Sequence, residues 1–296
     1  MTVQADRQQP QCETDKPDTL SRQDFQRLSA FIHAECGIKM PEAKKVMLEA
    51  RFQKRLRILG MPSFADYVEY LFSPHGLECE LHNMIDVVTT NKTDFFREPP
   101  HYDFLVQKAL PAILESMGAV LQRKLAIWSA GCSTGEEPYT LAIVLSEYME
   151  RHPGLNMDWS ILATDISTRV LEKAKLAIFE TERIAPIPDP LRRKYLMRSR
   201  DKNRDLVRIV PELRQKVSFR RLNFMDEDFG LREKMNVIFC RNVIIYFDRS
   251  TQTRLINKFN RQLTPGGYLF LGHSETLHGQ HVPLDQVAPT VYRKPA

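Results

Sequence analysis

The stretch WSAGCSTGEEPYT, from Trp128 to Thr140, decides the fold that this sequence predicts. Its first residues end the short apolar run KLAIWSA, which is typical of a buried strand, and its last residues belong to EEPYTLAIVLSEYME, which has helical apolar spacing. Gly131 and Gly135 lie in the turn between them, and Pro138 falls in the first helical turn, where proline is tolerated. A strand, a glycine turn and a helix N-terminus in this order are typical of a nucleotide-binding α/β sheet.

Strands and helices alternate through most of the chain beyond this turn. The further predicted strands are WSILATD, VSFRRLNF, MNVIFC, GGYLFLG and, as an edge strand near the C-terminus, TVYRK. Helices are predicted at 136–150, 166–179 and about 250–263. Strands separated by helices predict a parallel, doubly wound sheet.

The region Glu180–Lys216 breaks this alternation. It holds three prolines between Pro186 and Pro190, followed by the charged run RSRDKNRDLVRI. We interpret 180–218 as a small β-subdomain inserted into the sheet domain, built from a helix and a hairpin.

The chain before the sheet domain has a helical pattern. Ser21 and Asp24 resemble a capping box, and further helices are predicted at Pro41–Leu59, Ser63–Phe72 and Glu78–Val88. The resulting division of the chain is a disordered tail over 1–18, a helical domain over 19–88, and a sheet domain over 89–296 whose turn-rich link, 89–100, contributes to the ligand site. The tail lacks the apolar core that a secretion signal needs.

Composition argues against several classes of protein and site. No run of about 18 apolar residues occurs, so no membrane-spanning helix is predicted. The five cysteines are odd in number and form no CxxC pair, which fits a reducing cytosol and argues against a disulfide framework. His273, His278 and His281 lie in a loop without partner cysteines, so no metal site is predicted.

Two acids beside the glycine turn restrict its ligand. Glu136 and Glu137 would repel a pyrophosphate at ~4 Å by several kcal/mol if partly desolvated. S-adenosylmethionine suits the turn at Gly131 better, because it joins an adenosine to a cationic sulfonium and ammonium. Asp165 ends the next strand, where an acid can bind ribose hydroxyls; the alternative is that it caps the helix beginning near Ser167.

Five motifs run from about residue 20 to the C-terminus: NKTDFFRE (91–98), STGEEPYT (133–140), ATDIS (163–167), FCRNVIIYFD (239–248) and LFLGHSE (269–275). Together they resemble the chemotaxis receptor methyltransferases, the CheR family. The resemblance implies an all-helical N-terminal domain and a class I, Rossmann-like α/β methyltransferase sheet with a small inserted β-subdomain. It also implies methyl transfer from S-adenosylmethionine to glutamate side chains on cytoplasmic chemoreceptor helices, with S-adenosylhomocysteine as product.

The resemblance also implies a set of cofactor contacts. They are Asn91, Thr93 and Arg97 for the methionine part, Glu137 for the ammonium, Asp165 for the ribose, Asn223 and Phe224 for the adenine, Arg241 and Asn242 beside the sulfonium, and Tyr246 near the transferred methyl. Each of these contacts has a structural alternative, for example Asn223 as a turn residue and Tyr246 as a core residue with its hydroxyl paired to the backbone.

This chemistry needs no catalytic base. A glutamate is already ionised at neutral pH, and its attack on a sulfonium diminishes both charges, so a closed, dry site lowers the barrier. What remains is the alignment of oxygen, methyl carbon and sulfur. We expect Arg97, Arg241 and Tyr246 to perform this alignment.

Basic residues are concentrated between Lys44 and Arg57, where six of them face one acid, Glu49. A solvated helix face, a nucleic-acid contact and an acidic partner helix are the three interpretations. Because a receptor methylation region offers several glutamates, we favour the acidic partner helix. The candidate substrate-binding residues are Lys44, Arg51, Lys54, Arg55 and Arg57.

The expected partners are therefore chemoreceptors and not nucleic acid. Some family members bind a receptor's C-terminal peptide at the inserted subdomain, but the loop SRDKNRD has no glycine, which leaves tethering open. We expect a cytoplasmic monomer that is recruited to membrane receptor arrays. The competing functions are a nucleic-acid methyltransferase with a basic helical clamp, although no NPPY signature occurs, and a non-catalytic methyltransferase-like adaptor.

We predict that Tyr246→Phe slows turnover moderately, because it loosens alignment without removing a proton-transfer group. The pH–rate profile of this variant should stay flat between about pH 6 and 8, as measured by steady-state rates. A new ionisation in that profile would contradict the alignment role.

Overall fold

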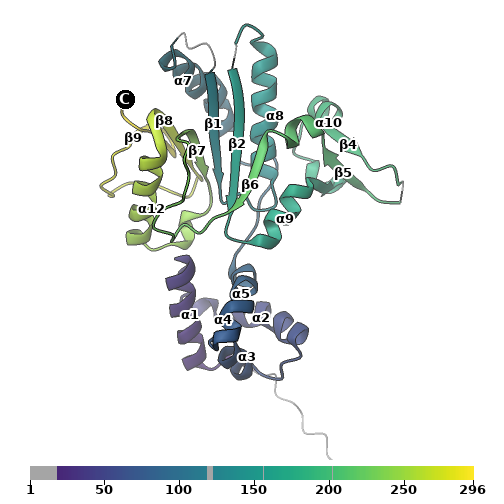
Figure 1. Ribbon diagram of the computed structural model, residues 1–296, viewed down its shortest axis with the longest axis vertical. Helices are drawn as coiled ribbons and strands as arrows, with labels where there is room; N and C mark the ends of the chain where they lie inside the picture. The colour runs from purple at the N-terminus through teal and green to yellow at the C-terminus, as the bar shows by residue number, and fades with distance from the viewer. Residues whose placement is uncertain (1–18, 119–122, 156, 202) are drawn as a thin grey trace, which may run out of the picture. The chain divides into compact units, whose positions relative to one another are not determined.

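The computed structural model describes residues 19–118, 123–155, 157–201 and 203–296, so the predicted tail at 1–18 lies outside the described residues. The chain divides into two compact units, drawn as ribbons in Figure 1. One holds the residues up to Ala30 together with Pro41–Leu81, and the other holds Phe31–Met40 together with His82–Ala296. Residues of helix α1, Arg22–Cys36, belong to both.

The first unit consists of short helices around an apolar core. After α1 these are the 3₁₀ helix η1 (Glu42–Lys44), α2 (Lys45–Leu59), α3 (Phe64–Leu71) and α4 (Pro74–Cys79). The α2 residues Leu48, Phe52 and Leu56 are buried, and the Phe52 ring centroid lies 5.1 Å from that of Tyr67. Gly60 ends α2 in the left-handed conformation, at φ +66°, which confirms the predicted end of this helix.

A buried ion pair stabilises this unit. Glu80 is 1% exposed, and its carboxylate accepts hydrogen bonds from Arg55 Nε at 2.6 Å, from Arg55 Nη2, and from Tyr67 Oη at 3.1 Å. Glu80 lies between α4 and α5 (Leu81–Val88), so the single helix predicted over Glu78–Val88 is wrong. The chain leaves the helix at the residue whose carboxylate is buried against Arg55.

The same pair involves Arg55, one of the candidate substrate-binding residues. Its guanidinium is bound to Glu80 and its side chain is only 17% exposed, and its contact with an acidic partner stays a prediction. Of the other candidate substrate-binding residues, Lys54 and Arg57 are exposed, and Lys44 and Arg51 are half-buried. Lys54 and Arg57 therefore form the exposed part of the predicted basic face.

The second unit contains a seven-stranded sheet in the order β6-β2-β1-β7-β8-β10-β9. Its strands are β1 (Arg123–Ala130), β2 (Met157–Asp165), β6 (Val217–Arg221), β7 (Met235–Cys240), β8 (Leu263–Leu271), β9 (Asp285–Ala288) and β10 (Val291–Arg293). The strands from β6 to β8 are parallel neighbours, which confirms the predicted parallel sheet. The prediction that TVYRK lies at the edge is wrong, because β10 pairs antiparallel with both β8 and β9.

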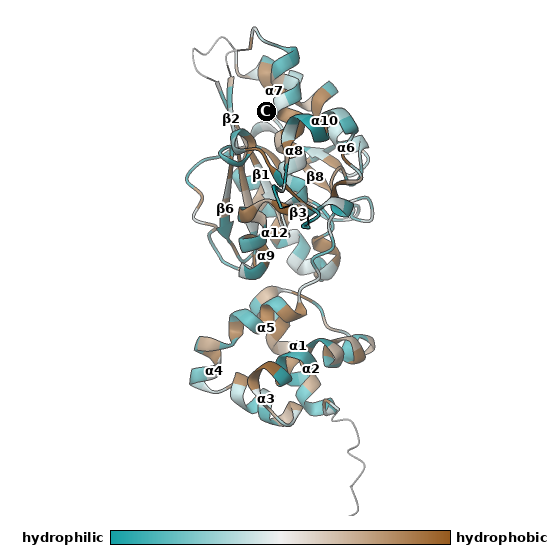
Figure 2. Ribbon diagram, turned by 90° about the vertical axis from the view of Figure 1, so that its right-hand side faces the viewer, coloured by the Kyte–Doolittle hydropathy of each residue, from teal (hydrophilic) through white to brown (hydrophobic). Residues whose placement is uncertain are grey.

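Helices cover both faces of this sheet. Leu125 and Ile127 of β1 pack in one apolar cluster with α7 (Leu110–Ser116) and α8 (Glu136–Arg151), whereas Ala126 and Trp128 pack in another with α12 (Arg249–Gln262). Figure 2 colours the centre of the sheet largely brown, as expected for strands that are buried on both faces. This layering leaves the carboxyl ends of β1, β2 and β7 together at one edge.

A smaller sheet is inserted between α9 (Thr168–Leu176) and β6. It has three antiparallel strands in the order β3-β5-β4, with bounds Ile178–Glu180, Leu206–Ile209 and Leu196–Arg198. The short helices η3 (Thr181–Ile184), α10 (Asp189–Tyr195) and α11 (Pro211–Arg214) complete the region. Among the helices of the described residues, none is both long and apolar enough to cross a membrane.

Two predicted boundaries in this region are wrong. The helix expected to reach Phe179 ends at Leu176, because Ala177 adopts a left-handed φ of +54° and the chain continues as β3. The Phe179 ring then packs against Phe95, with centroids 4.9 Å apart. The strand expected to reach Phe224 ends at Arg221.

We predict that Arg55→Ala destabilises the protein by about 3 kcal/mol, because Glu80 would stay buried without its cation. Urea unfolding measures this change in the free energy of unfolding. The neighbouring exposed residue provides a control: Lys54→Ala should change that free energy by less than about 0.5 kcal/mol. Equal effects of the two variants would show that the ion pair contributes nothing.

Candidate functional site

The glycine turn joins β1 to α8 at the carboxyl edge of the sheet. The backbone N–H groups of Gly131 and Cys132 donate to the Thr164 carbonyl at 2.8 and 2.9 Å, which ties the turn to the end of β2. Gly131 has a φ of +88°, and a Cβ atom there would lie 2.6 Å from Val243 Cγ2. Glycine is therefore needed for the turn to lie against the loop that follows β7.

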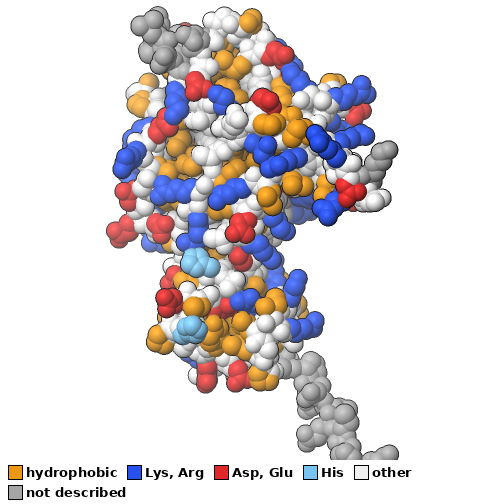
Figure 3. Space-filling view, turned by 45° about the vertical axis from the view of Figure 1, so that its right-hand side comes forward, with side chains coloured by type: hydrophobic (Ala, Val, Ile, Leu, Met, Phe, Trp, Pro, Cys, Tyr) orange, Lys and Arg blue, Asp and Glu red, His pale blue; other side chains and the backbone are white. Residues whose placement is uncertain are grey.

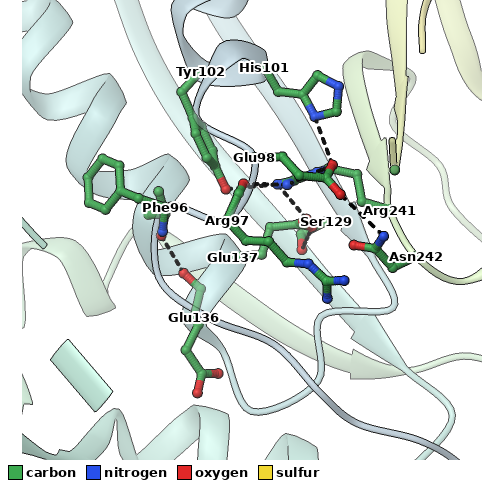
Figure 4. Close-up of polar contacts among 12 residues, drawn as sticks. Phe96, Arg97, Glu98, His101, Tyr102, Ser129, Glu136, Glu137, Arg241 and Asn242 are labelled. Carbon is green, nitrogen blue, oxygen red and sulfur yellow. Dashed lines mark hydrogen bonds and ion pairs between the residues drawn. The ribbon is translucent and has the colours of Figure 1, made fainter. Parts of the chain in front are cut away.

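The two acids of the turn, Glu136 and Glu137, face different surroundings (Figure 4). Glu136 is 1% exposed and pairs with Arg183, whose Nη2 lies 2.6 Å from Glu136 Oε1. Glu137 accepts a hydrogen bond from Ser129 Oγ at 2.7 Å and another from Arg241 Nη1 at 3.3 Å. The expectation that both acids repel a phosphate is wrong for Glu136, because the charge of Arg183 neutralises its carboxylate. Glu137 contacts Arg241 instead.

Arg241 stands at the centre of the site. Its side chain is 2% exposed, and its Nε and Nη2 donate to Glu98 Oε2 at 3.3 and 3.1 Å. Nη1 donates to Tyr102 Oη at 3.0 Å as well as to Glu137, and Nη2 also donates to the Arg97 carbonyl. One guanidinium thus joins the link before α6 (Pro100–Phe104), α6 itself and the first turn of α8.

Burial and the charge of Arg241 have opposite effects on the pKa of Glu98 and of Glu137. Burial raises the pKa of the Glu137 carboxyl, and the charge of Arg241 and the hydrogen bond from Ser129 offset only part of that shift. For Glu98, burial also favours the neutral form, but the charge of Arg241 and hydrogen bonds from His273 and Asn242 bring its pKa below the ordinary value. Glu98 is therefore ionised at neutral pH and is the stronger partner of Arg241.

The backbone around Arg97 is constrained. Phe96 and Glu98 both have left-handed φ values, +52° and +56°, which non-glycine residues adopt at a cost. The segment is held by a hydrogen bond from Phe96 N to Thr140 Oγ1 at 3.1 Å and by the bond from Arg241 to the Arg97 carbonyl. The guanidinium of Arg97 points away from this network in Figure 4, and its Nη1 donates to the Lys92 carbonyl at 3.1 Å.

Asp165 and Asn91 also lie beside the turn. The Asp165 carboxylate accepts from Ser133 N at 2.9 Å and from Ser167 N at 3.0 Å, and its burial raises the pKa of the carboxyl. The cap of α9 is Ser167, whose hydroxyl accepts from Val170 N, so the alternative that Asp165 caps this helix is wrong. Ser133 Oγ donates to the Asn91 carbonyl at 3.0 Å, so the 89–100 link lies against the glycine turn.

The residues expected at the adenine are differently placed. Phe224 is 9% exposed, and its ring packs against Trp128, Phe229 and Phe259 in the core. Asn223 donates to the Glu35 carbonyl at 2.6 Å and accepts from Met225 N at 3.0 Å, which fits a turn residue. Their contact with adenine stays a prediction.

Thr93 and Tyr246 are two further candidate cofactor contacts. Thr93 is buried, and its carbonyl accepts from Arg183 at 2.8 Å. Tyr246 is half-buried in the 3₁₀ helix η4 (Ile244–Tyr246), and its carbonyl accepts from Lys39 N at 2.9 Å. The roles expected for these two residues also stay predictions.

A buried carboxylate holds the loop after β7, which carries Asn242. Glu275 is 3% exposed and accepts from the backbone N–H groups of Gly272 at 2.6 Å, Asn242 at 2.9 Å and Ile245 at 3.2 Å. Asn242 has a φ of +59°, and its Nδ2 donates to Glu98 Oε1 at 3.3 Å. Sequence reasoning missed Tyr102, Ser129, Glu98 and Glu275, although Glu98 ends the motif NKTDFFRE and Glu275 ends LFLGHSE.

Known proteins match the chain over both units. Residues 91–293 match the family model described as CheR methyltransferase, SAM binding domain, and residues 23–89 match CheR methyltransferase, all-alpha domain. The chain is 41% identical over 275 residues to a chemotaxis protein methyltransferase of Borreliella burgdorferi, covering 93% of this chain and 95% of that protein. It is 38% identical over 273 residues to chemotaxis protein methyltransferase 2 of Pseudomonas aeruginosa, covering 92% and 93%. The chemotaxis protein methyltransferase of Escherichia coli is 37% identical over 273 residues, with 89% and 91% covered.

We predict that Glu275→Gln lowers the free energy of unfolding by about 2 kcal/mol, because an amide leaves buried N–H groups of the loop without an acceptor. Thermal unfolding should show a lower melting temperature. Glu233→Gln is the control, since Glu233 pairs with Lys124 at the surface and is 49% exposed. An unchanged melting temperature for Glu275→Gln would contradict the holding role.

Proposed function

The chain belongs to the CheR methyltransferase family, and from this membership we propose that it methylates glutamate side chains of chemoreceptors at the site centred on Arg241. The protein is an S-adenosylmethionine-dependent methyltransferase of chemotaxis. The group that receives the methyl and the role of each residue are the parts that we propose.

The observation that carries the proposal is the charge of the buried network. Glu98 and Glu137 surround one guanidinium, that of Arg241, so the network has one negative charge in excess. The methionine end of S-adenosylmethionine carries two cations, a sulfonium and an ammonium, which suit the excess acid of this network, and one carboxylate, which needs a separate cation. We assign the ammonium to Glu137 and the carboxylate to Arg97, whose guanidinium is directed away from the network.

The remaining cofactor contacts follow from the ends of neighbouring strands. Asp165 ends β2 beside the glycine turn, so we assign the ribose hydroxyls to it. Asn91 and Thr93 lie on the link beside the turn, and Asn242 lies on the loop beside Glu98. Gly131 has no side chain, so we propose that the cofactor lies close to the backbone of the turn there. Asn223 and Phe224 are the proposed adenine contacts; here the Asn223 amide donates to the Glu35 carbonyl and the Phe224 ring packs against Phe259.

The proposed step is a direct displacement. A receptor glutamate oxygen forms a bond to the methyl carbon while the carbon–sulfur bond breaks, and S-adenosylhomocysteine leaves as a neutral thioether. No proton moves, so no base is needed. The chain's part is to exclude water and align the reactants, with Arg241 held by Glu98 and Tyr102 and with Tyr246 proposed near the methyl.

The receptor surface is proposed from charge. The exposed residues Lys54 and Arg57 of α2, flanked by Lys44 and Arg51, suit a helix that presents several glutamates. Lys and Arg side chains also gather over the inserted sheet at the right of Figure 3. Strands β3 and β4 are the edges of that sheet, where a receptor peptide could add as a further strand. We propose a cytoplasmic monomer recruited to receptor arrays.

We predict that incubation with tritiated S-adenosylmethionine and receptor signalling fragments labels the receptor, and that mild alkali releases the label as methanol. Glutamate methyl esters are base-labile, whereas N-methyl groups on bases are not. Glu137→Gln should reduce S-adenosylhomocysteine affinity by at least about tenfold, because the hydrogen bond to a charged ammonium is weakened. Alkali-stable label would overturn the glutamate substrate, and full affinity in Glu137→Gln would overturn the assignment of the ammonium.

A further inference from the structure

Three side chains beside the Arg241 network lie at metal-ligand spacing. They are Glu98, His101 of α6 and His273 of the loop after β8, and one ligand atom from each lies within 4.8 Å of the others. Glu98 Oε2 is 3.4 Å from His101 Nδ1 and 3.9 Å from His273 Nε2. Sequence reasoning considered His273 together with His278 and His281, but among the described residues its metal-competent neighbours are Glu98 and His101.

Hydrogen bonding of His101 leaves one ring nitrogen without a partner. Thr290 Oγ1 donates its proton to the Pro289 carbonyl at 2.8 Å, so it accepts from His101 Nε2–H, also at 2.8 Å. The neutral ring then carries a lone pair on Nδ1. This nitrogen is buried and has no hydrogen-bond partner among the described residues, and it points toward Glu98 Oε2 (Figure 4).

Two facing lone pairs at this distance repel each other unless a proton or a metal cation lies between them. Zinc binds histidine nitrogen at about 2.0–2.1 Å and carboxylate oxygen at about 2.0–2.2 Å, so tetrahedral ligands lie about 3.3 Å apart. The separation of 3.4 Å between Glu98 Oε2 and His101 Nδ1 already meets this value. The His273 side chain is 53% exposed, so it can approach the metal and leaves a path from solvent.

We propose that Glu98, His101 and His273 form a binding site for a divalent transition metal such as zinc. Two imidazoles and one carboxylate are ligands that zinc and copper prefer over magnesium or calcium. The hydrogen bond from His101 to Thr290 orients the ring, as outer partners of metal-binding histidines commonly do. A fourth position is left for water.

The metal and Arg241 would compete for one atom. Arg241 Nη2 lies 3.1 Å from Glu98 Oε2, the oxygen that both histidines face. A metal bound there weakens the hold of Glu98 on Arg241, and Arg241 in turn contacts Glu137 and the Arg97 carbonyl. Zinc is therefore an antagonist of cofactor binding, a consequence that rests on the proposed function.

Calorimetric titration of the untagged, full-length protein with zinc chloride tests the site. We expect one zinc per chain in the wild type, a loss of affinity of at least about tenfold in His273→Ala, and no binding of magnesium. His278→Ala is the matched control, because His278 is an exposed residue of the same loop outside the cluster. Unchanged zinc affinity in His273→Ala, or equal losses in both variants, would overturn the site.

A second titration separates the site from the proposed function. Zinc should weaken S-adenosylhomocysteine binding by at least about fivefold in the wild type and not in His273→Ala, and S-adenosylhomocysteine should weaken zinc binding by the same factor. Zinc that binds through His273 without this reciprocal effect supports the metal site and contradicts the cofactor contacts proposed for the Arg241 network.

Discussion

A guanidinium buried between two carboxylates is the interaction on which the candidate site depends. Taking Arg241 out of water is costly unless its donors are satisfied, and Glu98, Glu137, Tyr102 and the Arg97 carbonyl satisfy them. These partners come from the link, α6 and α8, which are separated from Arg241 by more than a hundred residues. The site therefore forms only when the sheet that carries Arg241 has folded.

This dependence explains several features around the network. The left-handed backbone at Phe96 and Glu98 persists because two hydrogen bonds hold the segment, one from Arg241 to the Arg97 carbonyl and one from Phe96 N–H to Thr140. Glu275 performs the corresponding task for the loop that carries Asn242. Methyl transfer between two charged groups requires alignment and exclusion of water more than proton transfer, so a rigid, buried network suits the chemistry of the family.

The sequence predicted those parts of the site that are formed by residues close together in the chain. The strand, glycine turn and helix at 128–140 are confirmed, and Glu137 and Asp165 lie beside the turn as expected. Glu136 was wrongly given the same role, because no pattern within the turn reveals Arg183, which is 47 residues away. The pairing of Arg55 with the buried acid Glu80 was not predicted for a similar reason, because no pattern within the helix reveals a partner 25 residues away.

The sequence by itself determined the class of fold and the succession of helices and strands, because hydrophobic spacing, glycine and proline act over a few residues. The type of ligand followed from the acids beside the glycine turn and from the five family motifs. Tertiary structure alone decided which acid faces Arg241, that β10 lies inside the sheet, and that Glu98 meets His101 and His273. These contacts join residues far apart in the chain, so they depend on which strands become neighbours in the sheet. A charged side chain that is buried there pairs with whichever opposite charge lies close enough to offset its desolvation, wherever that residue stands in the sequence.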